Sequence, residues 1–166
     1  MSLRIRLEGI AETLQEFELA LEDRFAVGQH LIVNGYPDAG IYLLGYVAEM
    51  LLKTIYFRFT GAGPADLVGP RLAPARTVGR MLLPQITDEH YHSLRFWAML
   101  LQAERDRQGR PLPVNIALLF EVCTERLHNN WFVEMRYRRN QAMTAEALAV
   151  LSDVGWLRAN RLDLWR

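Results

Sequence analysis

Hydrophobic residues recur every three or four positions along most of the chain, which is the spacing of a helix with one buried face. In the first such stretch the remaining positions are mostly acidic and predict a long helix with an acidic outer side. Its apolar positions are Ile10, Leu14, Phe17, Leu21, Phe25 and Ile32. An Asn-Gly-Tyr-Pro sequence at 34–37 then ends this helix, because glycine adopts positive φ and proline starts a helix more readily than it continues one.

A second helix is predicted from Asp38 to about Phe59, and it is apolar nearly all round. A helix without a polar face is typical of the buried centre of a bundle. Proline and glycine alternate in the stretch 61–75 that follows, so we expect an irregular loop there, longer than most connections. A short helix is expected after it, over residues 77–83.

Three further helices complete the pattern. Thr87 is expected to cap the first of them, which ends before the Gly-Arg-Pro-Leu-Pro sequence at 109–113, and Thr144 is expected to cap the last. No stretch alternates apolar and polar residues as a strand would, so we expect one all-α domain over residues 1–166. It is predicted to be an up-and-down bundle of four or five main helices plus a short helix. The apolar stripes are Tyr91, Leu94, Ala98 and Leu101; Ile116, Phe120, Cys123, Leu127 and Trp131; and Leu148, Leu151, Val154 and Leu157.

The composition, 51% hydrophobic and 23% charged with a net charge of zero, is typical of a soluble globular protein. Balanced charge excludes a global field that would hold nucleic acid or an anionic membrane. Residues 1–57 carry eight acids and four bases, net −4, and residues 58–166 carry eleven acids and fifteen bases, net +4. Because the chain shows no secretory signal and its single cysteine excludes an internal disulfide, we expect a cytoplasmic protein that does not contact membranes.

Two segments carry a motif. Residues 39–53 read Ala-Gly-Ile-Tyr-Leu-Leu-Gly-Tyr-Val-Ala-Glu-Met-Leu-Leu-Lys, and residues 131–137 read Trp-Phe-Val-Glu-Met-Arg-Tyr. The first resembles the Tyr-Leu-x-Gly-Tyr-x-x-Glu-x-x-Leu-Lys stretch of the HEPN domain (higher eukaryotes and prokaryotes nucleotide-binding). The second is similar to the Trp-x-x-Glu-x-Arg-Tyr segment of many small HEPN proteins. The resemblance implies a HEPN-like bundle that acts as a homodimeric binding or regulatory module. The partner it implies is a nucleotidyltransferase or another component of a toxin–antitoxin or defence system.

Two charged residues lie in the middle of the apolar second helix. Glu49 and Lys53 are one helical turn apart, in the orientation that favours an ion pair. Buried charges are costly without partners, and Arg136 is a candidate for a bidentate contact with Glu49. We therefore expect Glu49, Lys53 and Arg136 to form a buried polar network between the second helix and the segment after the fourth. A catalytic role for these residues is the alternative.

Many HEPN domains resemble metal-independent ribonucleases that use an arginine and a histidine four to six residues apart near the last helices. Arg139 followed by Asn140 matches the opening of this motif, but the last histidine of the chain is His128, so the motif cannot be completed there. Arg24 and His30 are the only pair with the required gap, and they lie on the first helix. We expect no catalytic site, and a ribonuclease with this displaced motif stays as an alternative.

One compact patch of the chain is both basic and aromatic. It could meet RNA or nucleotide phosphates, since arginine binds phosphate through two parallel hydrogen bonds and aromatic rings stack on bases. Pairing within the protein or with solvent is the simpler interpretation. The patch consists of Arg136, Tyr137, Arg138 and Arg139.

Two Glu-x-x-His spacings, Glu89 with His92 and Glu125 with His128, suggest a second alternative, a metal-binding four-helix bundle. Their order along the chain differs from the usual pattern of such proteins, so we expect neither a metal nor another cofactor. Cys123 falls on an apolar stripe and is expected to be a core residue rather than a nucleophile.

Overall fold

The computed structural model describes residues 12–86, 92–137 and 141–166, apart from the side chains of Arg136 and Tyr137. Every regular element in these ranges is helical, which confirms the predicted all-α bundle. The elements are α2 (Leu14–Val33), α3 (Pro37–Phe59), α4 (Gly69–Leu82), α5 (Leu94–Arg107), α6 (Val114–Asn130), the 3-10 helix η1 (Val133–Tyr137), α7 (Thr144–Ala159) and α8 (Arg161–Trp165).

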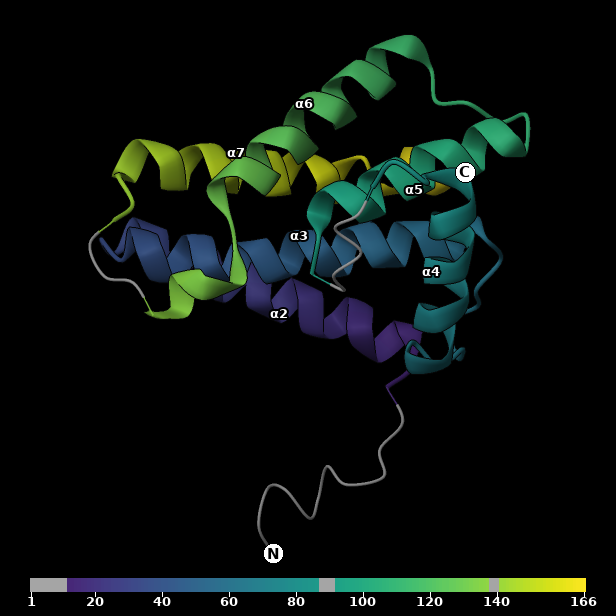
Figure 1. Ribbon diagram of the computed structural model, residues 1–166. Coiled ribbons are helices and arrows are strands. Elements are labelled where there is room, and N and C mark those ends of the chain that lie inside the picture. The colour runs from purple at the N-terminus through teal and green to yellow at the C-terminus, as the bar shows by residue number, and fades with distance from the viewer. Residues whose placement is uncertain (1–11, 87–91, 138–140) are drawn as a thin grey trace, which may run out of the picture.

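The helix α3 is the centre of the bundle, as its apolar sequence predicts. It packs against α2, α5, α7 and α8, and α2 and α7 lie on opposite sides of it in Figure 1. By length and hydropathy alone α3 could cross a membrane, but most of its residues are buried among the other helices. Its apolar surface is therefore accounted for by the core of this domain.

The helices α2 and α3 form a tight hairpin. Thr13 and Glu16 make a capping box at the start of α2, and Gly35 provides the positive φ of the turn, at 82°. Pro37 lies in the first turn of α3, where no backbone amide needs a partner. The two helices approach closely at Gly40, where a Cβ atom would lie 2.3 Å from Cγ1 of Ile32.

The prediction of an irregular loop over residues 61–75 is wrong in its second half. The loop ends at Val68, and α4 begins at Gly69, so the short helix expected over 77–83 is the later part of a longer one. Proline is compatible with this because Pro70 lies in the first turn of α4, where its missing amide costs nothing. Pro74 is tolerated inside the helix, and the sequence pattern overestimated its power to break it.

Two helix starts also differ from the prediction. Ser93, not Thr87, caps the third main helix: its hydroxyl accepts a hydrogen bond from the Phe96 amide at 3.2 Å, and α5 begins at Leu94. Thr87 and Tyr91 lie outside the described residues. Thr144 is the first residue of α7 rather than its cap, because Met143 holds the cap position.

Candidate functional site

The two motif segments, 39–53 and 131–137, lie against each other although they are far apart in the chain. The indole of Trp131 packs on α3 at Gly45, where a Cβ atom would lie 2.0 Å from Cδ1 of the ring. Its Nε1 donates a hydrogen bond of 3.0 Å to the carbonyl of Tyr42, and its ring meets the edge of Tyr46 at 5.2 Å between centroids. The missing side chain of Gly45 is therefore what allows the segment after α6 to dock on the central helix.

One turn further along α3, the carboxylate of Glu49 is buried between two partners. One oxygen accepts a hydrogen bond from the Lys53 ammonium, and the other lies 2.8 Å from Nδ1 of His92. The Glu49 and Lys53 side chains are only 6% and 8% exposed, and Lys53 lies over the ring of Trp97 at 5.4 Å. Because the ion pair is shielded from water, its attraction is much stronger than that of a surface pair.

The expected pairing of Glu49 with Lys53 is thus present, and His92 is a member that the sequence did not reveal. His92 is 43 positions from Glu49, and no spacing rule connects a residue that precedes the cap of α5 with the middle of α3. The side chain of Arg136 lies outside the described part of the chain, so its contact with Glu49 stays a prediction.

Next to the buried ion pair, two tyrosines and one histidine lie in line. We call these three residues, Tyr42, Tyr46 and His92, the Tyr–His row. The hydroxyls of Tyr42 and Tyr46 are 3.3 Å apart, and the rings of Tyr46 and His92 meet edge to face at 5.9 Å. His92 is about half exposed. Nδ1 of His92 faces Glu49, and the row places two hydroxyls and a half-exposed imidazole beside one another on the α3 side of the bundle.

The displaced arginine and histidine pair is exposed, but its members do not share a face of α2. Six positions along a helix turn a side chain by about 120° and shift it by about 9 Å. A guanidinium nitrogen of Arg24 donates to the Ala20 carbonyl at 3.2 Å, and the His30 ring lies 3.3 Å from the amide nitrogen of Asn34. Each side chain is thus engaged within its own turn of the helix.

The residues of the two Glu-x-x-His spacings do not form one site in the described ranges. His92 contacts Glu49, whereas Glu125 and His128 line a groove between α5 and α6. Glu89 lies outside the described residues. Within those residues, no three side chains of the types that bind metals come together in a way that could hold an ion. The described geometry therefore gives the metal-binding alternative no support.

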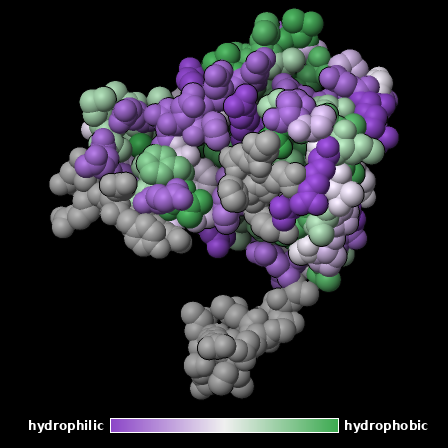
Figure 2. Space-filling view, in the orientation of Figure 1, coloured by the Kyte–Doolittle hydropathy of each residue, from purple (hydrophilic) through white to green (hydrophobic). Residues whose placement is uncertain are grey.

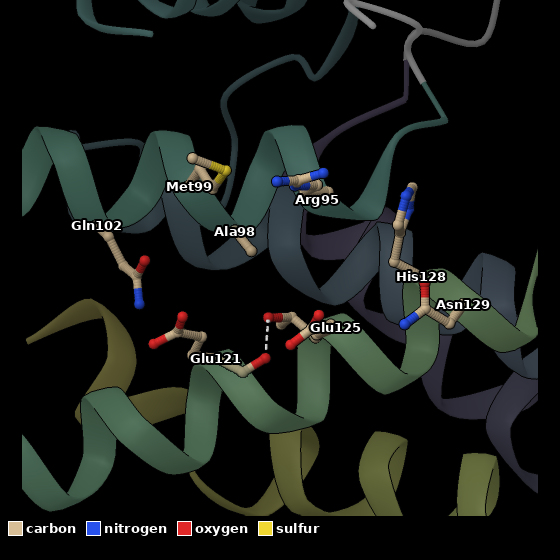
Figure 3. Close-up of a pocket in the computed structure, with 9 residues that line it drawn as sticks. Arg95, Ala98, Met99, Gln102, Glu121, Glu125, His128 and Asn129 are labelled. Atoms are coloured by element: carbon tan, nitrogen blue, oxygen red, sulfur yellow. Dashed lines mark hydrogen bonds between the residues drawn. The ribbon is translucent and has the colours of Figure 1, made fainter. Parts of the chain in front are cut away.

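Figure 3 shows the groove between α5 and α6, which encloses about 300 Å³. Gln102 extends toward α6 from α5, where Arg95 also lines the groove, and Glu121, Glu125 and His128 border it on α6. Charges of both signs line this groove, so its electrostatics favour neither an anion nor a cation.

Arg138 and Arg139 of the basic patch lie outside the described residues. Arg136 and Tyr137 belong to η1, which packs against α3, but their side chains are not described. The patch therefore follows directly in the chain from the segment that docks beside the Tyr–His row, and its contact with phosphate stays a prediction.

Cys123 is buried, and its thiol donates a weak hydrogen bond of 3.5 Å to the carboxylate of Asp153. Burial, together with the negative charge of Asp153, raises the pKa of the Cys123 thiol to about 11. The opposing influence of Arg126, which pairs with Asp153 through a bond of 2.9 Å from its Nε, is smaller.

We expect the folded protein not to react with a thiol reagent such as 5,5′-dithiobis(2-nitrobenzoic acid) at pH 7–8, because the thiolate is the reactive form and a raised pKa keeps the thiol protonated. The release of the coloured thiolate would be followed by absorbance, with the same protein in urea as the control. Labelling of the native protein at the rate seen in urea would contradict the assignment of Cys123 to the core.

Comparison of the chain with models of protein families, with curated proteins and with solved structures found no match.

Proposed function

We propose that this chain is a non-catalytic, HEPN-like binding or regulatory module that works as a homodimer and recognises RNA or a nucleotide. The observation that supports the proposal is the direct contact between residues 39–53 and 131–137, the two segments on which the resemblance rests. The same resemblance implies that the protein partner is a nucleotidyltransferase of a toxin–antitoxin or defence system. The compartment would be the cytoplasm.

The chemistry of this region suits recognition of a nucleotide. The ion pair of Glu49 and Lys53 is too deeply buried to meet a ligand. Its role is to fix the orientation of the His92 ring through the contact between Glu49 and Nδ1 of His92. The Tyr–His row supplies rings and hydrogen-bonding atoms for a base or ribose. The basic segment that begins in η1 supplies arginines for phosphate.

A binding role fits the described residues better than cleavage. General acid–base catalysis requires two groups within reach of the same reacting phosphate. Arg24 and His30 point from different sides of α2, and the sequence after Arg139 contains no histidine to complete the usual pair.

The proposal predicts that Arg138→Ala with Arg139→Ala weakens binding of RNA without changing the fold. A labelled single-stranded RNA would be titrated by fluorescence anisotropy in a chelator at several salt concentrations, with gel analysis of the RNA after each titration. We expect intact RNA, and a plot of log affinity against log salt whose slope falls by about one for each arginine removed. A merely structural role of these arginines would not change that slope.

The matched control is Arg24→Ala with His30→Ala, which removes one arginine and one histidine from an exposed helix face. We expect this variant to bind RNA as the wild type does. Cleavage of RNA by the wild type that this variant loses would replace the proposal with the ribonuclease alternative. Wild-type protein that binds neither RNA nor a nucleoside triphosphate would overturn the recognition of nucleotides.

A further inference from the structure

The outward face of α6 exposes a row of large hydrophobic side chains. Val114, Leu118 and Val122 are 76%, 59% and 48% exposed, and Leu119 beside them is 49% exposed. Figure 2 shows hydrophobic residues gathered at the top of the molecule, where Figure 1 places the N-terminal half of α6. No other described helix exposes so many large hydrophobic residues in so short a stretch, and such a patch commonly marks an interaction surface.

The order of residues on this face is symmetric about Leu118. Val114 and Val122 lie four positions before and four positions after it, on the same side of the helix. Two identical helices can pair antiparallel around a two-fold axis. A residue that lies a given number of positions after the axis in one chain then meets the residue that lies the same number of positions before the axis in the other chain. An axis at Leu118 therefore brings Leu118 against its own copy and Val114 against Val122 of the second copy.

The charges beside this row of hydrophobic side chains favour an antiparallel pair of α6 helices over a parallel pair. Glu121 and Glu125 border the exposed face. In a parallel pair each glutamate would lie level with its own copy, and like charges at that distance repel. In the antiparallel pair centred on Leu118, Glu121 lies level with Asn115 and Glu125 with Pro111. A carboxylate opposite an amide can accept a hydrogen bond, so the repulsion is avoided.

We propose that α6 forms the interface of a homodimer in which the two α6 helices run antiparallel and the two-fold axis passes Leu118. The occupant of the exposed face is thus a second copy of this chain. The inference extends the proposed function, which includes a homodimer but assigns it no surface. The candidate nucleotide site on α3 and η1 takes no part in this interface.

The first test measures the mass of the wild type and of Leu118→Glu in solution by light scattering. At the axis, one substitution places two carboxylates against each other, so we expect the wild type to have the mass of two chains and the variant that of one. Because the Leu118 side chain is mostly exposed, the circular dichroism of the variant is expected to match the wild type, whereas its melting temperature falls by as much as the lost dimer had stabilised the fold. The matched control is Leu19→Glu on α2, where a leucine is 61% exposed, and this variant should stay dimeric.

The second test determines the direction of the helices by cross-linking. Leu118→Cys should form a disulfide between chains under mild oxidation, because the two copies of this residue meet at the axis. In the antiparallel pair the two copies of residue 114 are about 12 Å apart, at 1.5 Å per residue, so Val114→Cys should not cross-link. The wild type, whose thiol at Cys123 is buried, provides the background.

Each outcome bears on the inference separately from the recognition of nucleotides. A dimer that Leu118→Glu leaves intact, or equal cross-linking at positions 114 and 118, overturns the interface and leaves the RNA titration untouched. A monomeric wild type overturns the interface together with the homodimer of the proposed function. Loss of RNA binding in Arg138→Ala with Arg139→Ala, with the dimer preserved, supports the proposed function whichever surface forms the dimer.

Discussion

Replacing Gly45 with alanine is expected to destabilise the folded protein by about 3 kcal/mol, the upper part of the range for overpacking a core. The added methyl group would lie 2.0 Å from Cδ1 of Trp131 and 2.1 Å from its Cγ and Nε1. An indole is rigid and cannot bend away, so the ring must withdraw from α3. It would then lose its hydrogen bond to the Tyr42 carbonyl and its contact with Tyr46.

The matched control is Gly155→Ala in α7, where an added Cβ meets no atom within 4 Å. There the only effect is the higher helix propensity of alanine, which is expected to stabilise the protein by about 1 kcal/mol. The same chemical change should therefore have opposite signs at the two positions. Urea unfolding followed by circular dichroism measures both, and equal effects would show that Trp131 does not pack on α3 as described.

Replacing Glu49 with glutamine is expected to cost about 3–5 kcal/mol, the range for removing one partner of a buried ion pair. The amide keeps the shape of the side chain but not its charge. Lys53 would then be left as a buried ammonium without a counter-ion, and His92 would lose the carboxylate that holds its ring. Urea unfolding at pH 7 measures the loss of stability.

Two further variants separate the charge from the packing. Combining Glu49→Leu with Lys53→Met removes both charges, and this double variant is expected to be more stable than Glu49→Gln because no unpaired charge remains. Glu125→Gln, at an exposed position of α6, should change the free energy of unfolding by less than about 0.5 kcal/mol. If Glu49→Gln were as mild as Glu125→Gln, water would have to reach the Glu49 carboxylate.

The helices of this protein follow closely from local pattern. The apolar stripe from Ile10, which lies outside the described residues, to Ile32 predicted α2, and the all-round apolar stretch predicted α3 within a few residues, because helical spacing and burial are properties of neighbouring positions. Proline predicted the helix boundaries less well. Its missing amide hydrogen disrupts a helix interior but is harmless in the first turn, and the tertiary surroundings decide which case applies. That is why α4 extends into a stretch predicted as a loop.

Some contacts of the candidate site could likewise be predicted from the sequence, and others could not. Glu49 and Lys53 share one turn of one helix, so their spacing alone was enough to predict the ion pair. The contact of His92 with Glu49 and that of Trp131 with Gly45 join residues that no local rule connects. By itself, the sequence determined the place of most helices and the pairing of the buried charges Glu49 and Lys53, since both depend on residues within one or two turns. The tertiary structure alone decided that His92, which precedes the cap of α5, meets Glu49 and that Trp131, which follows α6, meets Gly45, because both contacts depend on how whole helices pack.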